Sequence, residues 1–133
     1  MSGFKDNVIL ILRHNGMLQG ESVGWVVTGN NNFNKTEELT QALRDMKFLV
    51  VNNPQKPVVL FDYVVIDSYR QYDTPKLLKA LDNLKEDGII IVQVTPGLYQ
   101  DKYVSRLGAF TITKVKLGEE EYLVFHTGVD YGN

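Results

Sequence analysis

The stretch FDYVVIDSYRQYD, residues 61–73, contains the side chains whose types and order most suggest chemistry. Asp67 directly follows a run of apolar and aromatic residues, at the point where a buried strand would end. A carboxylate at that position can accept a proton from an amine or a hydroxyl group of a substrate. Asp67 can equally cap a turn by accepting backbone N–H groups, as aspartate commonly does. Tyr69 and Tyr72 could stack on a planar substrate ring, or they could simply cover the end of the sheet.

A glycine-containing loop near the start of the chain is the second candidate for a site. In RHNGMLQGESVG, residues 13–24, His14, Gly16 and Gly20 follow an apolar run that predicts the first strand. These glycines could cradle a phosphate or a cofactor tail, but the loop has neither a G-x-G-x-x-G nor a P-loop pattern, and spaced glycines more often indicate tight turns. His14 and His126 are the only histidines. Neither has a partner at metal-ligand spacing, so no metal site is expected.

Strands and helices alternate along the part of the chain that would position these residues. The apolar run NVILIL (7–12) predicts a strand buried on both faces. One helix is predicted from Asn34 to Met46 by its apolar stripe, and a second from the capping residue Thr74 to Gly88. The other predicted strands begin near Trp25, Lys47, Tyr63 and Ile89, and an antiparallel hairpin has strands beginning near Phe110 and Tyr122.

This order predicts one α/β domain over residues 1–133. The expected architecture is three-layered and doubly wound, with a mostly parallel sheet of seven strands and a C-terminal antiparallel hairpin. Ligands of such sheets bind outside the carboxyl ends of the strands, so Asp67 would face the ligand and Asp62, at the start of its strand, would not. The charge run GEEE (118–121) is interpreted as a solvated hairpin turn.

Composition excludes several classes of function. The chain has no cysteine, which removes disulfides, thiolate catalysis and cysteine metal sites. The net charge of -2 gives no strong field for nucleic acid or an anionic membrane. No apolar run approaches the length of a membrane helix, and the first residues lack the apolar core of a signal peptide. A cytoplasmic protein is expected.

The second half of the chain resembles the class I S-adenosylmethionine-dependent methyltransferase fold. FDYVVIDS followed by LLKALDNLKEDGIIIVQV is similar to the fourth strand, the following helix and the fifth strand of that superfamily. LGAFTITKVKLGEEEYLVF is similar to its last helix end and closing hairpin. Spermidine synthases share this fold and are similar in the same stretch. The resemblance covers about half of the chain and implies the fold more strongly than an activity.

The resemblance implies a cofactor site in the first half, where the residues depart from the superfamily pattern. An acidic residue and glycines are expected after the first strand, but Arg13, His14 and Asn15 precede Gly16 there. The ribose-binding carboxylate expected after the second strand is replaced by the neutral Thr28 and Asn30. Asn52, after the third predicted strand, could face an adenine edge. The helix expected between the first two strands has no counterpart in the sequence.

Two functions follow from the resemblance and its departures. The favoured one is a degenerate, non-catalytic methyltransferase-like domain that binds no cofactor and serves as an interaction module. Its partner would be another protein or a second copy of the chain, and the methyltransferase-like domain of anamorsins is a precedent at the level of the fold. The alternative is a minimal active S-adenosylmethionine-dependent methyltransferase, with Asp67 and Tyr69 in the substrate cleft. A phospho-receiver domain is disfavoured, because the acidic pair after its first strand is missing.

Overall fold

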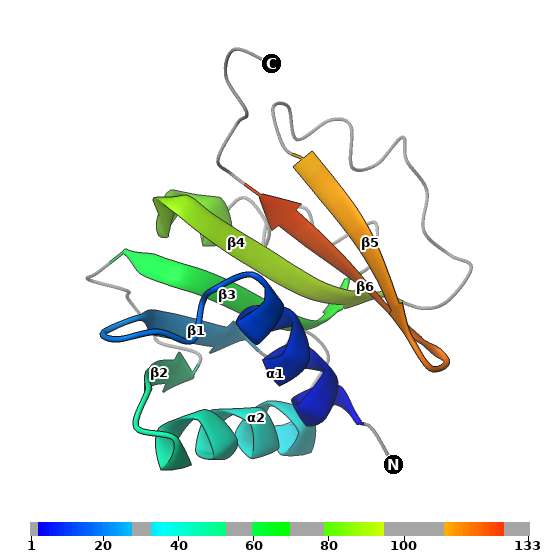
Figure 1. Cartoon of the computed structure of the whole chain (residues 1–133), viewed down its shortest axis with the longest axis horizontal. Coiled ribbons are helices and arrows are strands. Elements are labelled where there is room, and N and C mark those ends of the chain that lie inside the picture. The colour runs from blue at the N-terminus through cyan, green and yellow to red at the C-terminus, as the bar shows by residue number, and fades with distance from the viewer. Residues whose placement is uncertain (1–2, 28–32, 53–59, 70–78, 95–110, 127–133) are drawn as a thin grey trace.

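The described part of the molecule is one mixed sheet with two helices packed against one of its faces (Figure 1). The computed structural model describes residues 3–27, 33–52, 60–69, 79–94 and 111–126. Its elements, in chain order, are α1 (Phe4–His14), β1 (Val23–Val27), α2 (Phe33–Asp45), β2 (Leu49–Asn52), β3 (Phe61–Tyr69), β4 (Leu84–Val94), β5 (Thr111–Leu117) and β6 (Glu120–His126).

The sheet has the strand order β2-β1-β3-β4-β6-β5. Strands β2, β1, β3 and β4 run parallel, and the hairpin of β5 and β6 joins β4 in the antiparallel direction. The predicted fold class, an α/β domain with a mostly parallel sheet and a C-terminal antiparallel hairpin, is therefore confirmed. The predicted number of strands is wrong for the described residues, because the sheet there has six strands and not seven.

The missing strand is the apolar run at residues 7–12, which lies inside helix α1. The buried side chains of α1 include Phe4, Val8, Ile11 and Leu12, which are spaced by four, three and one residues. Leu10, in contrast, is exposed. That spacing is one face of a helix. A short apolar run fits a buried strand and a buried helix equally well. Here Phe4, just upstream of the run, extends the apolar spacing to that of a helix.

The second predicted helix, from Thr74 to Gly88, is also wrong at its C-terminal end. Residues 79–82 are helical, but β4 begins at Leu84, so Gly88 lies in a strand instead of ending a helix. A Cβ atom on Gly88 would come within 2.6 Å of the Leu84 side chain and 2.9 Å of the Asp62 carbonyl oxygen. Gly88 is therefore required by close packing where the β3–β4 register shifts.

Each face of the sheet has its own apolar core. Helices α1 and α2 cover one face, and their side chains pack on Val26, Tyr63, Val65, Ile91 and Val124. We call this the helical face. The opposite face buries Trp25, Phe61, Val64, Ile90, Val92, Leu123 and Phe125 together with Ala80. The indole ring of Trp25 stacks on Phe61 with 5.3 Å between ring centroids, inside this second core.

Both helices begin at the carboxyl end of the parallel strands and end at their amino end. Helix α2 follows β1 and leads back to the start of β2, and α1 lies alongside it in the same layer (Figure 1). Strands β1, β2, β3 and β4 end at Val27, Asn52, Tyr69 and Val94, so these residues mark the carboxyl end of the sheet. This is the end at which ligands of parallel sheets bind.

Candidate functional site

Asp67 lies near the carboxyl end of the sheet, as predicted. It is the seventh residue of β3 and is only 2% exposed. Ile66 before it belongs to the opposite core, and the β3–β4 register shifts between Ile66 and Tyr69, the segment that contains Asp67. Tyr69, the other predicted catalytic residue, ends β3, and its backbone pairs with Val94 of β4. The two residues are thus brought to the expected end of the sheet.

Asn52 occupies the carboxyl end of β2, the strand next to β1. Its Nδ2 donates a hydrogen bond of 3.4 Å to Thr40 Oγ1 on α2. Its Oδ1 is buried and has no hydrogen-bond partner among the described residues. A groove of about 560 Å³ runs beside Asn52 along the exposed side of α2 and is lined by Asn34, Glu37, Glu38, Thr40, Gln41, Arg44 and Asn52. Asn52 therefore contributes a neutral amide to the lining of this groove, and the oxygen of that amide is buried.

Two further polar groups meet on the helical face near the end of β4. Lys35, in the first turn of α2, donates a hydrogen bond from Nζ to Gln93 Oε1. The same ammonium group lies 4.8 Å from the centroid of the Phe4 ring of α1. Gln93 is the residue before the last of β4. The contact thus joins the starts of both helices to the carboxyl end of the sheet.

A buried network on the neighbouring strand β6 continues this polar region. Asn7 of α1 donates hydrogen bonds to Glu120 Oε2 at 2.8 Å and to the Tyr122 hydroxyl at 3.2 Å. The Tyr122 hydroxyl donates to Glu120 Oε2 at 2.5 Å. Burial, and next the hydrogen bond to Glu120, raise the pKa of Tyr122 well above its ordinary value. Tyr122 therefore stays a neutral donor, and it lies directly opposite Gln93 in the β4–β6 pairing.

The predicted cofactor loop is not at this end of the molecule. His14 is the last residue of α1, and Gly16 and Gly20 lie in the connection from α1 to β1. Strand β1 starts at Val23, so these residues precede the first strand and lie at the amino end of the sheet, opposite Asp67. His14, Gly16 and Gly20 were assigned to a cofactor site because they were expected to follow the first strand. That expectation is wrong.

Gly16 has a local structural role instead. Its N–H bonds to the Arg13 carbonyl and the Met17 N–H bonds to the Leu12 carbonyl, at 3.1 and 2.9 Å, and the φ of Gly16 is 72°. This is the Schellman motif, in which a left-handed residue, usually glycine, satisfies the last carbonyls of a helix. Thr28 and Asn30, the predicted ribose contacts, lie outside the described residues.

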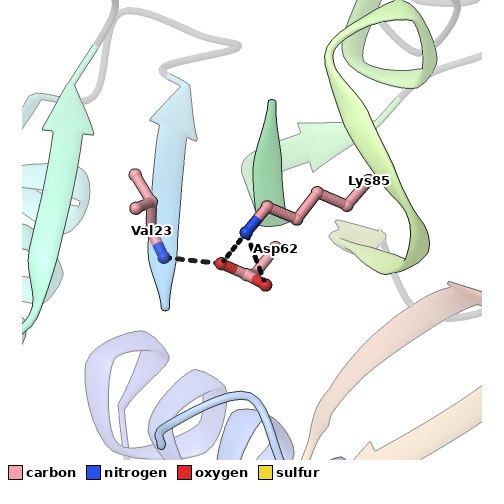
Figure 2. Close-up of polar contacts among 3 residues, drawn as sticks. All are labelled: Val23, Asp62 and Lys85. Atoms are coloured by element: carbon pink, nitrogen blue, oxygen red, sulfur yellow. Dashed lines mark hydrogen bonds and ion pairs between the residues drawn. The ribbon is translucent and has the colours of Figure 1, made fainter. Parts of the chain in front are cut away.

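An ion pair between Asp62 and Lys85 lies at the amino end of the sheet (Figure 2). The Val23 N–H donates to Asp62 Oδ2 at 2.8 Å, and Lys85 Nζ lies 3.3 Å from the same oxygen. Asp62 thereby fixes the start of β1 to the start of β3. Asp62 lies at the start of its strand, as predicted, and its contacts are structural.

The sequence interpretation missed most of the polar region at the carboxyl end. The run GEEE was expected to be solvated, but only Gly118 and Glu119 form the turn, and Glu120 and Glu121 belong to β6. Glu120 accepts the hydrogen bonds described above, and Glu121 is 7% exposed with Lys114 Nζ at 3.6 Å from Oε1. The alternation of β6 could have indicated that one of these carboxylates points to each face.

The described histidine, aspartate and glutamate residues include no group of three that could hold a metal ion. Among the described helices, none is long and apolar enough to cross a membrane.

Comparisons with known proteins bear on the fold. No known family profile matches the sequence, and no curated protein matches it. Solved structures do match. A precorrin-6y C5,15-methyltransferase from Geobacter metallireducens superposes with a TM-score of 0.58 at 13% identity, over 91% of this chain and 88% of that one. A ribosomal protein L11 methylase from Lactobacillus delbrueckii subsp. bulgaricus gives 0.57 at 11% identity, over 94% and 79% of the two chains.

An O-methyltransferase from Bacillus cereus, solved in complex with SAH, gives a TM-score of 0.55 at 10% identity over 92% of this chain and 79% of that one. At such identities the likeness concerns the fold alone. It agrees with the strand order, with the antiparallel closing hairpin and with the sequence resemblance of residues 58–126. The chain therefore has the class I S-adenosylmethionine-dependent methyltransferase-like fold.

Proposed function

We propose that this chain is a methyltransferase-like domain that has lost productive cofactor binding and acts as a protein-interaction module. The observation that carries the proposal is Asn52. It stands at the carboxyl end of β2, the strand beside β1, where the resemblance implies a carboxylate for the ribose hydroxyls. The chain offers a neutral amide at that position, and one of its two polar atoms is already bonded to Thr40.

The size of the loss follows from the chemistry of the ribose diol. A carboxylate accepts two hydroxyl donors in charge-assisted hydrogen bonds, each worth about 1.5–3 kcal/mol, against about 0.5–1.5 kcal/mol for a neutral bond. Asn52 keeps only Oδ1 for such a donor. Binding should weaken by on the order of 1–2 kcal/mol, which is about tenfold or more. We expect no S-adenosylmethionine binding tighter than roughly 1 mM, and we take this affinity as the limit for lost cofactor binding.

The proposal can be tested by restoring the missing charge. Asn52→Asp places a carboxylate on the same backbone position, and Asn52→Ala removes the acceptor altogether. We expect calorimetric titration with S-adenosylmethionine to show about tenfold tighter binding for Asn52→Asp than for Asn52→Ala, with the unsubstituted chain close to the alanine variant. Micromolar affinity in the unsubstituted chain would contradict the loss of cofactor binding.

The interaction half of the proposal concerns the partner, which we expect to be another protein or a second copy of the chain. Sedimentation of the purified chain over a range of concentrations separates these two partners. A concentration-dependent rise in mass indicates self-association. A monomer at all concentrations leaves a different protein as the partner.

The second candidate function is a minimal active methyltransferase, and the corrected order of elements favours it. Helix α2 does lie between β1 and β2, although the sequence suggested that this helix was missing. The segment directly after β1 is TGNNN (28–32), so a glycine does follow the first strand. In this alternative the cofactor supplies the methyl group, and Asp67 accepts the proton released by the acceptor. Asp67→Asn should then abolish methyl transfer with the fold intact, and an unchanged rate would exclude Asp67 from the reaction.

A further inference from the structure

The Lys35 ammonium group occupies an unusual position on the helical face. It lies over the Phe4 ring, 4.8 Å from the centroid, and it donates a hydrogen bond to Gln93 Oε1. The three residues come from α2, α1 and β4. Phe4 itself is 6% exposed, so the ring face is largely shielded from water. A cation held between an aromatic face and an amide oxygen in such surroundings is attracted more strongly than at an open surface.

The position of Lys35 in its own helix does not explain this contact. Lys35 lies in the first turn of α2, which contains no acidic residue. A positive charge is unfavourable there, because the free N–H groups make the helix start partially positive. Contacts with Phe4 and Gln93, from outside the helix, must therefore hold the ammonium group where it is.

The neighbouring groups strengthen the preference for a cation. The Phe4 ring lies 6.4 Å from the Tyr122 ring, centroid to centroid, with an interplanar angle of 35°. Tyr122 is bonded to the carboxylate of Glu120, and Tyr122 lies opposite Gln93 in the sheet. Two aromatic rings, an amide oxygen and a carboxylate thus lie in one neighbourhood at the carboxyl end of the sheet. Aromatic and acidic surroundings of this kind recognise onium groups, meaning quaternary ammonium or sulfonium cations.

We infer that Phe4 and Gln93 form a cation-binding subsite that Lys35 fills from within the chain. An external onium group would have to displace the Lys35 ammonium, so the occupied subsite excludes such ligands. For S-adenosylmethionine this inference rests on the proposed function. Its sulfonium is positively charged, so Lys35 disfavours it in addition to the deficit at Asn52. The sulfur of S-adenosylhomocysteine is an uncharged thioether, so this ligand should be much less affected.

The direct test uses a probe without any adenosine group. Lys35→Ala removes the ammonium and leaves space between Phe4 and Gln93. Addition of tetramethylammonium chloride should shift the nuclear magnetic resonance signals of Phe4 and Gln93 in this variant. Sodium chloride at the same ionic strength is the control. We expect an apparent affinity about tenfold or more above that of the unsubstituted chain. Equal behaviour of the two proteins, or no binding to the variant, would overturn the inference.

Two controls keep the outcome decisive. Lys35→Arg retains a cation and should behave like the unsubstituted chain. The double variant Lys35→Ala/Phe4→Leu lacks the ring and should lose the gain, whereas retained binding would show that the ring is not the recognition element. Thermal melting identifies any variant that fails to fold, and Lys35→Ser then replaces Lys35→Ala.

A second titration separates this inference from the proposed function. In Lys35→Ala, S-adenosylmethionine should gain about tenfold in affinity and S-adenosylhomocysteine less than about threefold. Tight binding of S-adenosylmethionine by the unsubstituted chain would contradict the proposed function, whatever the probe shows. Failure of tetramethylammonium binding would contradict the cation subsite alone.

Discussion

Two tyrosines on the helical face, Tyr63 near the amino end of the sheet and Tyr122 at the carboxyl end, are both fully buried and have opposite surroundings. The Tyr63 hydroxyl has no hydrogen-bond partner among the described residues, and its ring lies against Gly24 of the neighbouring strand. The Tyr122 hydroxyl bonds to both Asn7 and Glu120. Burial, with the charge of Asp62 as a smaller cause, also raises the pKa of Tyr63 well above its ordinary value.

The difference shows how the two ends of one sheet are specialised. At the amino end, tight packing and main-chain contacts such as that of Asp62 with Val23 determine the structure. At the carboxyl end, polar side chains from α1, α2, β4 and β6 meet in buried contacts. Buried polar groups are costly unless they are satisfied, so their concentration at the carboxyl end makes this end the candidate site.

The largest expected effect concerns packing at the amino end. A Cβ on Gly24 would come within 2.1 and 2.2 Å of two Tyr63 ring carbons and 2.4 Å of the Tyr63 hydroxyl oxygen, which cannot retreat from a filled core. Gly24→Ala should therefore lower the free energy of unfolding by about 3 kcal/mol or prevent folding, as overpacking does. Urea denaturation measures the change. Gly3→Ala is the control, since its Cβ would meet nothing within 4 Å, and equal stabilities for the two variants would contradict the packing account.

The next effect tests the carboxyl-end network. Asn7→Ala removes both donors to Glu120 and Tyr122 at a site that is 3% exposed. Leaving these buried acceptors with fewer partners should cost about 2 kcal/mol. Asn15→Ala removes a hydrogen bond to the Ile11 carbonyl at a half-buried helix end and should cost less, about 0.5 kcal/mol. Similar losses for both variants, measured by denaturant titration, would show that the network does not stabilise the fold.

The comparison of the two tyrosines predicts changes of opposite sign. Tyr63→Phe deletes a buried hydroxyl that has no partner in the described part of the chain, and it should stabilise the protein by about 1 kcal/mol. Tyr122→Phe deletes a hydroxyl with two partners and should destabilise it by about 1 kcal/mol. Thermal or urea unfolding of the two variants side by side gives both signs. Two losses of the same size would remove the distinction between the ends of the sheet.

The smallest expected effect lies where α2 ends at the amino end of the sheet. Lys47 has a φ of 72° in a Schellman motif, with its N–H bonded to the Arg44 carbonyl and the Phe48 N–H bonded to the Leu43 carbonyl. Gly16 holds the equivalent position after α1. Lys47→Gly should therefore raise the stability by about 0.5–1 kcal/mol, because glycine adopts this conformation without strain. A loss of stability in urea denaturation would contradict this reading of the turn.

Much of the fold could be predicted from the sequence, because its signals are local. The strands around Trp25, Tyr63 and Tyr122 are β-branched or aromatic runs bounded by turn residues, and they form β1, β3 and β6. The run at 7–12 carried no such signal, since its six residues fit either type of element. That one assignment placed the expected cofactor loop at residues 13–20, which precede the first strand, β1.

The candidate site was less predictable because its contacts are long-range. Asn7 and Glu120 are 113 positions apart, and nothing in either neighbourhood indicates that they meet. Lys35 and Gln93 are 58 positions apart and come together only after α2 has packed over the sheet. The position of Asp67 near the carboxyl end of the sheet could be predicted from the sequence, because a carboxylate after a buried strand is itself a local pattern. Asn52 was predicted to follow the third strand, but it ends the second strand, β2.

The central claim is that the carboxyl end of this methyltransferase-like fold no longer binds the cofactor productively. Titration of the unsubstituted ¹⁵N-labelled chain with S-adenosylmethionine tests it directly, with the backbone amide signals of Val27, Asn52 and Asp67 as reporters. We expect no saturable shift of these signals below roughly 1 mM ligand, equivalent to about -4 kcal/mol. Saturation of the same signals at micromolar concentrations would contradict the claim and would favour the active methyltransferase.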